Sequence, residues 1–314
     1  MNLHKNKKEF KQLITLVSQQ LSIPESAIER DYYIVLMLYN LSNSEYYNTC
    51  VFKGGTSLSK CYPNSINRFS EDIDLTFLGM NKNDNYCDKK IKKIEEIMTT
   101  GFNTQKINEE RNKRNKSIYA WLDDESKKIK LEIGSSVKPD PFSTKYIKSY
   151  IHEYLEKNNP KYIQEYELTT VKINTLNIER TFIDKIMAVK RHAICGNLRS
   201  KVRHIYDVTK LFQLEEIKDF LSNKDELKRL IKLTKETDSN YLTKRNIPKE
   251  YNPLAQYDFE EFKEYFNDEI RGLYENLHKT LLFTNDVQSF NEAINTFSEI
   301  DKILKSIGEW LTKR

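Results

Sequence analysis

Apolar side chains recur along this chain with two different periods, and the dominant period changes near the middle of the sequence. In the first half, alternating apolar and polar residues are interspersed with runs in which apolar residues recur every three or four positions. Alternation is typical of strands buried on one face, and the longer spacing is typical of amphipathic helices. The predicted strands span 48–53, 69–78, 117–122, 129–137 and 171–176. The predicted helices of this half span 5–20, 24–42, 56–62, 86–101 and 146–157.

Two connections in this half bear on the predicted fold. The strands at 117–122 and 129–137 are separated by a short polar stretch, which favours a β-hairpin. The very polar segment 103–116 is interpreted as a mobile loop or an irregular strand.

From Ile178 onward, the helical period continues almost to the end of the chain. The predicted helices span 178–194, 200–213, 214–222, 224–236, 258–281 and 286–312. The connection 237–257 contains two prolines and many polar residues. The change of period predicts an α/β domain over 1–175 and a helical bundle over 176–314, so the expected fold class is α+β.

Length and composition fit a folded, two-domain protein, because 314 residues are about twice the usual length of one domain. The 51 basic and 46 acidic residues leave a net charge of +5, which permits an anionic partner but is equally typical of a solvated surface of mixed charge. The four cysteines form no CxxC pair, which favours reduced thiols and a cytoplasmic location. No apolar run approaches the roughly 18 residues of a membrane span, so no membrane association is expected.

Two carboxylates, Asp72 and Asp74, stand two residues apart in the predicted strand 69–78. Residues two apart share one face of a strand, so both carboxylates project together, while the apolar residues between and after them face the other way. Hard oxygen ligands of this kind suit Mg²⁺, which one or two carboxylates and the phosphates of a substrate commonly hold. The alternative is an exposed strand with two solvated acids. The apolar opposite face argues for a packed sheet and therefore for the metal site.

Two adjacent glycines, Gly54 and Gly55, precede this strand. Glycine lets the backbone approach a ligand closely, and the predicted helix that follows points free N–H groups toward the same space. The hydroxyl groups of Thr56 and Ser57 stand at the start of that helix. The turn is therefore interpreted as a phosphate site, although an ordinary strand-to-helix turn would look the same if it stood alone.

The sequence closely resembles the AbiEii/AbiGii-type toxin family at two blocks, Gly-Gly-Thr-Ser-Leu-Ser-Lys at 54–60 and Arg-Phe-Ser-Glu-Asp-Ile-Asp-Leu at 68–75. A weaker likeness lies in Glu-Arg-Asp-Tyr-Tyr at 29–33, and the resemblance as a whole runs from about 25 to about 215. These toxins are nucleotidyltransferases of the DNA-polymerase-β-like superfamily. The resemblance implies a nucleotidyltransferase domain with a mixed sheet, followed by the helical bundle.

The resemblance also implies further site residues. Ser70 lies inside the second block, and Glu132 stands where the superfamily has its third metal-binding acid, usually Asp in this family. Lys185 matches the functional lysine of the family and Arg191 the arginine that follows it. Asp207 matches the functional acid of an Arg-Asp-x-x-Asp-Leu block.

Each of these assignments has a structural alternative. Glu132 could be a solvated strand residue, and Lys185 could lie at the rim of an apolar stripe. Asp207 could form a surface pair with Arg203, four residues earlier. His204 replaces the first acid of the block, which removes the usual role of that position.

The function implied by the resemblance is that of a toxin from a bacterial toxin–antitoxin or phage abortive-infection system, with an antitoxin as its partner. The expected reaction is transfer of a nucleotide from NTP to an acceptor hydroxyl with Mg²⁺, or Mn²⁺ in its place. Related toxins suggest the 3′ end of tRNA as the acceptor, and basic residues after Ile178 are consistent with an RNA partner. Two alternatives remain open, namely a nucleotidyltransferase that modifies a protein or small molecule, and a nucleotide- or RNA-binding module without transfer activity.

Overall fold

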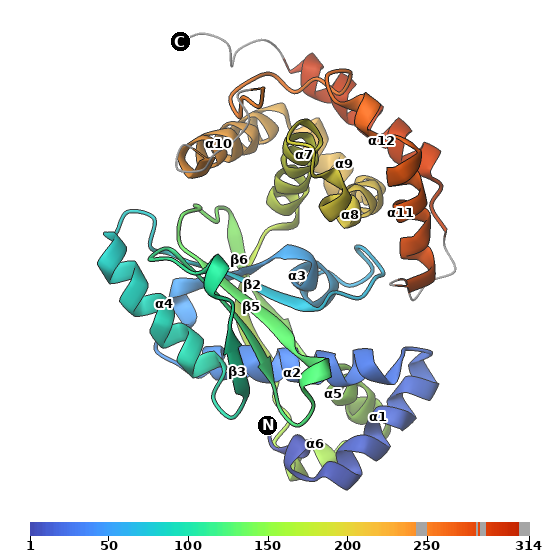
Figure 1. Cartoon of the computed structure of the whole chain (residues 1–314). Helices are drawn as coiled ribbons and strands as arrows, with labels where there is room; N and C mark the ends of the chain where they lie inside the picture. Colours follow the sequence, from blue (N-terminus) through green and yellow to red (C-terminus); the bar gives the residue numbers. More distant parts are fainter. Residues whose placement is uncertain (243–249, 281, 283–286, 308–314) are drawn as a thin grey trace. The chain divides into compact units, whose positions relative to one another are not determined.

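The computed structural model of the chain describes residues 1–242, 250–280, 282 and 287–307 (Figure 1). It divides into two compact units. Unit 1 comprises Met1–Pro63 and Phe69–Leu176, and unit 2 comprises Asn64–Arg68 and Asn177–Arg314. The change from one unit to the other therefore falls at Leu176, next to the boundary expected from the hydrophobic period. The sequence did not predict that Asn64–Arg68 belongs to the second unit.

Unit 1 contains one mixed sheet of seven strands in the order β3-β4-β5-β2-β1-β7-β6. The pairs β2–β5 and β1–β7 are parallel, and the other neighbours are antiparallel, including the expected hairpin β4–β5. The strands are β1 (Cys50–Lys53), β2 (Asp72–Phe77), β3 (Asn103–Lys106), β4 (Asn115–Trp121), β5 (Ile129–Gly134), β6 (Phe142–Ile147) and β7 (Val171–Leu176). The mixed sheet confirms the predicted α+β class.

Helices pack against this sheet and against each other (Figure 1). α2 contacts both α4 and β7, while α3 directly follows β1 and contacts β2. The α-helices are α1 (Lys7–Leu21), α2 (Glu25–Ser42), α3 (Gly54–Cys61), α4 (Asp84–Met98), α5 (Tyr150–Asn158) and α6 (Lys161–Glu165). The 3-10 turns are η1 (Leu3–Lys5), η2 (Tyr47–Thr49), η3 (Asn108–Glu110) and η4 (Glu125–Lys127).

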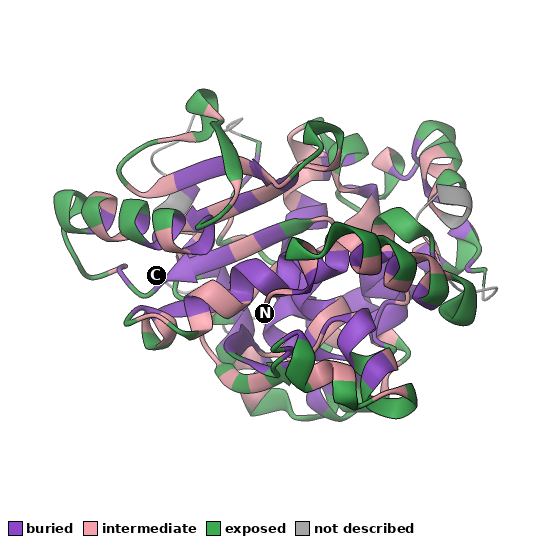
Figure 2. Cartoon of the chain, turned by 90° about the horizontal axis from the view of Figure 1, so that it is seen from below, coloured by how far each residue is buried: buried purple, intermediate pink, exposed green. Residues whose placement is uncertain are grey.

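The core of unit 1 follows from the alternation along its central strands. On β2, Ile73, Leu75 and Phe77 are at most 3 % exposed. On β5, the alternate residues Leu131 and Ile133 are fully buried. Figure 2 colours the chain by burial, and the strands of the sheet carry both buried and intermediate residues. The apolar face of the sheet is thus buried, which leaves the polar face of β2 and β5 to present other side chains.

The predicted helix 146–157 was wrong at its start. Tyr146 and Ile147 lie in strand β6, which pairs with β7, and the helix α5 begins only at Tyr150. The hydroxyl of Ser149 accepts a hydrogen bond from the backbone N–H of His152 at 3.2 Å and caps the helix there. Of the two interpretations of the polar segment 103–116, the structure bears out a strand at its start, because the segment begins with the edge strand β3, whose residues are all exposed. An exposed edge strand has no apolar face, so its sequence gives no alternation.

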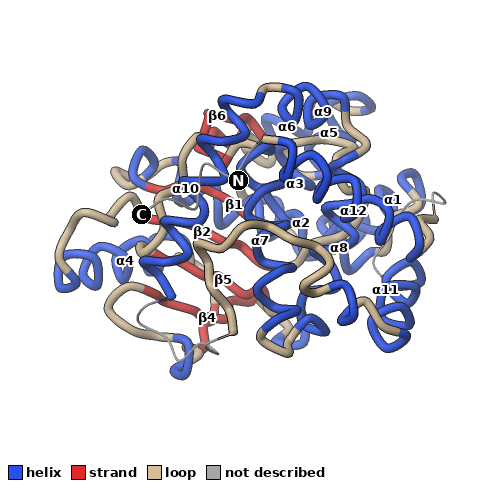
Figure 3. The backbone as a smooth tube through the Cα atoms, turned by 90° about the horizontal axis from the view of Figure 1, so that it is seen from above, coloured by secondary structure: helices blue, strands red, loops and turns tan. Residues whose placement is uncertain are grey.

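From Asn177 onward, the elements that the structure describes are helices, and Figure 3 shows α7 to α12 as helices. α8 packs against α7, α9, α11 and α12. The helices are α7 (Ile178–Ile194), η5 (Leu198–Lys201), α8 (Val202–Phe212), α9 (Glu215–Ser222), α10 (Lys224–Leu242), η6 (Lys263–Tyr265), α11 (Asp268–Thr280) and α12 (Phe290–Ser306).

The predicted helix 258–281 was too long. α11 begins at Asp268, and the preceding residues form a turn whose phenylalanines pack together instead of continuing a helix. Phe259 lies 5.2 Å from Phe266 and 5.8 Å from Phe297, measured between ring centroids. α10 in turn extends six residues into the predicted connection 237–257. Parts of three predicted segments lie outside the described residues. They are 243–249 of the connection 237–257, 281 of the predicted helix 258–281, and 286 and 308–312 of the predicted helix 286–312.

No helix among the described residues is long and apolar enough to cross a membrane.

Candidate active site

The two predicted metal-binding acids lie at the start of β2, on the polar face of the sheet of unit 1. β2 runs parallel to β5, with Asp72 beside Lys130 and Asp74 beside Glu132. Because neighbouring strands are about 5 Å apart, the three acids form one group on adjacent strands. The structure therefore brings Asp72, Asp74 and Glu132 together as the sequence predicted, and it adds Lys130, which the sequence analysis did not consider.

The acids influence each other electrostatically. Although the Asp72 side chain is exposed, the surrounding protein atoms remove part of the hydration of its carboxyl group. This partial burial, together with the charges of Asp74 and Glu132, raises the pKa of Asp72 to about 6. The positive charge of Lys130 acts to lower the pKa of Asp72. A group of acids that repel each other in this way is a fitting place for a cation.

Glu132 is already engaged by a side-chain cation. Its carboxylate forms a close ion pair with Lys130 on the same strand, and Lys130 also lies 2.8 Å from Glu110 in η3. Within the described residues, no group of three or more His, Cys, Asp or Glu side chains is arranged to hold a metal ion. The structure thus offers Asp72 and Asp74 as a pair, and the role of Glu132 as a third metal ligand stays a prediction.

The glycine turn lies directly against this acid pair. Gly54 has a φ of +86°, a left-handed conformation that residues with a side chain rarely adopt. A Cβ atom built on Gly54 would lie 2.2 Å from Oδ2 of Asp74. Only glycine fits here, both because of the backbone conformation and because the Asp74 carboxylate occupies the space. The glycine turn and the strand β2 therefore depend on each other through the close approach of Gly54 and Asp74.

Replacement of Gly54 by alanine is expected to reduce nucleotide transfer on the order of 100-fold, because the added methyl group displaces the Asp74 carboxylate. The left-handed backbone should add a stability loss of about 1–2 kcal/mol. Urea unfolding and a transfer assay measure the two effects separately. Gly101→Ala is the matched control, since Gly101 has a φ of +85° but no atom within 4 Å of its Cβ position. Equal activity of the two variants would contradict the role of the turn.

The hydroxyl groups at the start of α3 form local hydrogen bonds. The Thr56 hydroxyl donates to the backbone carbonyl of Asp72, and the Ser57 hydroxyl donates to that of Gly54 at 2.9 Å. Both side chains are buried, so these bonds fix the turn relative to β2. Among the described residues, the side chain of the N-cap residue Lys53 forms no hydrogen bond with the start of α3. Ser70 is half-buried and lies two residues before β2.

The segment 29–33 contains Asp31, which links α2 to α3, the helix that begins at the glycine turn. Asp31 of α2 forms a buried ion pair with Lys60 of α3 at 2.7 Å. It also accepts a hydrogen bond from the backbone N–H of Tyr150 at 2.8 Å. The link between α2 and α3 gives a physical reason for the sequence block 29–33 to accompany the glycine turn.

Unit 2 contains a second group of predicted residues, described here within that unit. Asp207 of α8 is fully buried and accepts two hydrogen bonds from Arg68, from Nε at 2.6 Å and from Nη2 at 2.7 Å. Lys185 of α7 is buried as well, and its Nζ lies 2.8 Å from the same carboxylate. The structure therefore does not bear out the alternative of a surface pair between Asp207 and Arg203. No role was predicted for Arg68, whose signal in the sequence was its place at the head of the block 68–75.

Two cations share the buried carboxylate of Asp207. Burial by itself would raise the pKa of Asp207, but the charges of Arg68 and Lys185 hold this pKa well below its usual range. Burial and the charge of Lys185 lower the pKa of His204 well below its ordinary value, so His204 adds no positive charge. Its Nδ1 atom is buried and has no hydrogen-bond partner among the described residues.

Other basic residues after Ile178 have partners inside unit 2. Arg191 pairs with Asp238 at 2.7 Å, and Lys190 is buried and donates to the backbone carbonyl of Gln256 at 2.6 Å. The exposed Arg199 pairs with Glu269 at 2.8 Å. These ion pairs weaken the expectation of a basic surface in this region, and the nucleotide-binding role of Arg191 stays a prediction.

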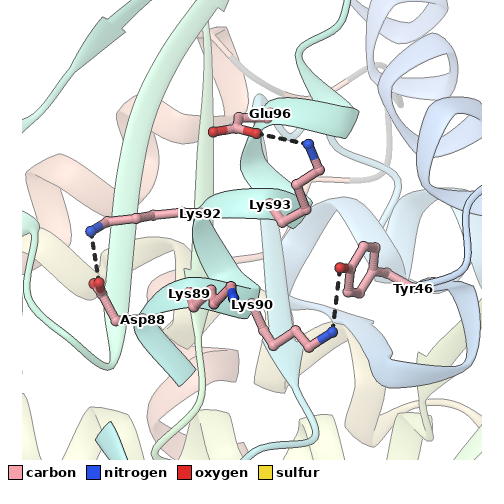
Figure 4. Close-up of a pocket in the computed structure, with 7 residues that line it drawn as sticks. All are labelled: Tyr46, Asp88, Lys89, Lys90, Lys92, Lys93 and Glu96. Atoms are coloured by element: carbon pink, nitrogen blue, oxygen red, sulfur yellow. Dashed lines mark hydrogen bonds and ion pairs between the residues drawn. The ribbon is translucent and has the colours of Figure 1, made fainter. Parts of the chain in front are cut away.

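One concave region of unit 1 lies away from the acid pair, on α4 (Figure 4). It has a volume of about 600 Å³ and is lined by Tyr46, Asp88, Lys89, Lys90, Lys92, Lys93 and Glu96. Lys92 pairs with Asp88 at 2.6 Å, and Lys93 pairs with Glu96 at 3.2 Å. Lys90 contacts the hydroxyl of Tyr46 at 3.5 Å, and the lining is otherwise the polar, mixed-charge face of α4, so this region gives no argument for a specific ligand.

Comparisons with known proteins bear on the family and the fold of this chain. Residues 36–296 match the family model described as "Nucleotidyl transferase AbiEii toxin, Type IV TA system". A comparison with curated proteins found no match. Among solved structures, the chain is similar to MenT4, a nucleotidyltransferase toxin from Mycobacterium tuberculosis H37Rv, with a TM-score of 0.56 and 18 % identity over 95 % of this chain and 91 % of that chain. At this identity the likeness shows a shared fold.

A second structure, from H. pylori and described as a candidate nucleotidyltransferase, has 19 % identity over 82 % of this chain and 98 % of that chain. Its TM-score of 0.36 is too low to support an argument. The resemblance seen in the sequence blocks is confirmed by the family match, which spans most of the chain. The protein therefore belongs to the AbiEii nucleotidyl transferase toxin family of type IV toxin–antitoxin systems, and it is an enzyme of the nucleotidyltransferase class that uses NTP.

Proposed function

We propose that this toxin transfers a nucleotide from NTP to the 3′-terminal hydroxyl of tRNA in a reaction that depends on Mg²⁺. The observation that supports the transfer chemistry best is the pair Asp72 and Asp74, held against the Gly54 turn at the start of β2. An acid pair of this kind would be unnecessary in a module that only binds nucleotide or RNA. The biological role proposed with it is growth arrest in phage abortive infection, with an antitoxin as the partner that the family implies.

The acid pair fits a divalent cation. Asp72 and Asp74 would hold Mg²⁺, since two carboxylates on one face of a strand supply the hard oxygen ligands that this ion prefers. The bound ion would supply charge stabilisation at the reacting phosphate and lower the pKa of the attacking hydroxyl. Mn²⁺ prefers similar ligands and would serve in its place. Burial and the charges of Asp74 and Glu132 raise the pKa of Asp72, and a bound cation would offset this repulsion.

Two features support the binding of a triphosphate. The free N–H groups at the N-terminus of α3 follow the glycine turn and suit phosphate oxygens. In unit 2, Lys185 and Arg68 both lie against the buried carboxylate of Asp207. We propose that Lys185 neutralises charge on the triphosphate, while Asp207 holds the lysine and Arg68 in position.

The tRNA acceptor can be tested directly with purified protein, Mg²⁺, each of the four labelled NTPs in turn, and total tRNA. Label is expected on tRNA with at least one NTP. The matched control is tRNA whose terminal diol has been oxidised with periodate, which removes the attacking hydroxyl and should abolish labelling. Label on the protein instead of the tRNA would favour the alternative of protein modification. Bound but uncleaved NTP in every reaction would favour a binding module and contradict the proposal.

A further inference from the structure

Lys130 is the one basic side chain that the β2–β5 register places next to the acid pair. It is the direct neighbour of Asp72 in the parallel pairing, and it lies on the same face as Glu132, two residues later. Its side chain is 20 % exposed and pairs with Glu132 and with Glu110, the latter at 2.8 Å. Although partial burial acts against it, hydrogen bonds to both glutamates raise the pKa of Lys130, which remains fully charged. A permanent positive charge therefore stands beside the proposed cation site.

We propose that Lys130 acts as an internal counter-cation that withholds Glu132 from the acid pair and weakens the binding of a divalent ion until nucleotide arrives. This inference rests on the proposed function, because it assumes that Asp72 and Asp74 hold the metal. Three carboxylates on adjacent strands would form a strong site for a divalent ion even in an empty enzyme. The lysine cancels one of those charges and occupies the third acid. The negative charge of the triphosphate would then replace the charge of Glu132 that Lys130 neutralises, so that metal and nucleotide bind together.

The ion pair also accounts for a feature of the structure. Glu132 lies beside Asp74 in the register, yet the described residues contain no three-acid group arranged for a metal. The close contact between Glu132 and Lys130 explains why the third acid is directed to the lysine. Glu110 holds the lysine from the other side, so the arrangement is a chain of alternating charges across η3 and β5.

The test measures Mn²⁺ binding to the purified full-length protein by electron paramagnetic resonance, without nucleotide, so that activity is not the readout. Lys130→Met is expected to bind Mn²⁺ roughly five- to tenfold more tightly, the effect of removing a unit charge about one strand spacing away. Lys130→Arg keeps the charge and should bind as the unchanged protein does. Lys128→Met is the matched control, because this lysine of the same hairpin pairs only loosely with Glu125, at 3.8 Å. It should change the affinity less than twofold.

A second substitution tests whether the gain in Mn²⁺ affinity comes from the release of Glu132 or only from the loss of the positive charge of Lys130. In the Lys130→Met protein, a further Glu132→Gln change should remove most of the gain in affinity. Thermal unfolding verifies that each variant is folded, and Lys130→Gln replaces Lys130→Met if the latter is unstable. A gain equal to that of Lys128→Met, or one that survives Glu132→Gln, would overturn the inference while leaving the proposed function intact. Failure of Asp72→Ala to lower Mn²⁺ binding in any background would overturn both.

Discussion

Replacement of Asp72 by alanine is expected to lower nucleotide transfer by at least about 10³-fold, because it removes half of the acid pair that would hold the metal. The fold should not suffer. The pKa of Asp72 is raised to about 6 in the folded protein, so its ionised form is less favourable there than in the unfolded chain at neutral pH. Removal of the carboxylate should therefore leave the free energy of unfolding unchanged or slightly higher. Transfer assays and urea unfolding at pH 7 measure both effects, and growth arrest on expression should disappear.

The matched control for Asp72 is Asp123→Ala in the same unit. Asp123 is an exposed acid whose ion pair with Lys7 is solvated on both sides, and such pairs contribute little to stability. This variant should retain full activity and full toxicity. An Asp72→Ala protein that accumulates normally and still arrests growth would rule out the metal-dependent mechanism.

Replacement of Asp207 by asparagine is expected to destabilise the protein by about 3–5 kcal/mol, because it leaves the buried cations of Arg68 and Lys185 without their anion. Urea unfolding at pH 7 measures this loss. Asp238→Asn is a suitable control, since Asp238 has one partly exposed partner, Arg191, and its loss should have a much smaller effect. A stability equal to that of the unchanged protein would show that the cluster is not the paired arrangement described here.

For Asp207→Asn we also expect a loss of stability that depends on pH. The folded-state pKa of Asp207 is depressed, so its contribution to stability is present above the unfolded value of about 3.9 and is lost as the pH falls below it. The difference between the unchanged protein and Asp207→Asn should therefore be largest near neutral pH and shrink below about pH 4. A double variant, Asp207→Asn with Lys185→Met, removes one orphaned cation and should recover part of the lost stability.

Much of the fold could be predicted from local pattern. The alternation around Ile73 and Leu75 identified β2 and its polar face, and the helical spacing identified α1, α2 and α7 within a few residues. These predictions hold because burial of one face imposes a period on the sequence. β6 and β3 could not be predicted this way. Both present exposed residues, and they exist because a neighbouring strand offers backbone hydrogen bonds that no local period records.

The site likewise has a part that could be predicted from local pattern and a part that only the folded structure shows. The sequence by itself determined the acid pair of Asp72 and Asp74 and the glycine turn, since residues two apart on a strand must share a face. Only the tertiary structure decided that Asp74 fills the space beside Gly54, that Glu132 is engaged by Lys130, and that Asp207 joins Arg68 to Lys185. Those partners are far apart in the chain or depend on the register of parallel strands. Long-range contacts of this kind are set by packing and electrostatics in the folded state, which the order of residues along one segment does not encode.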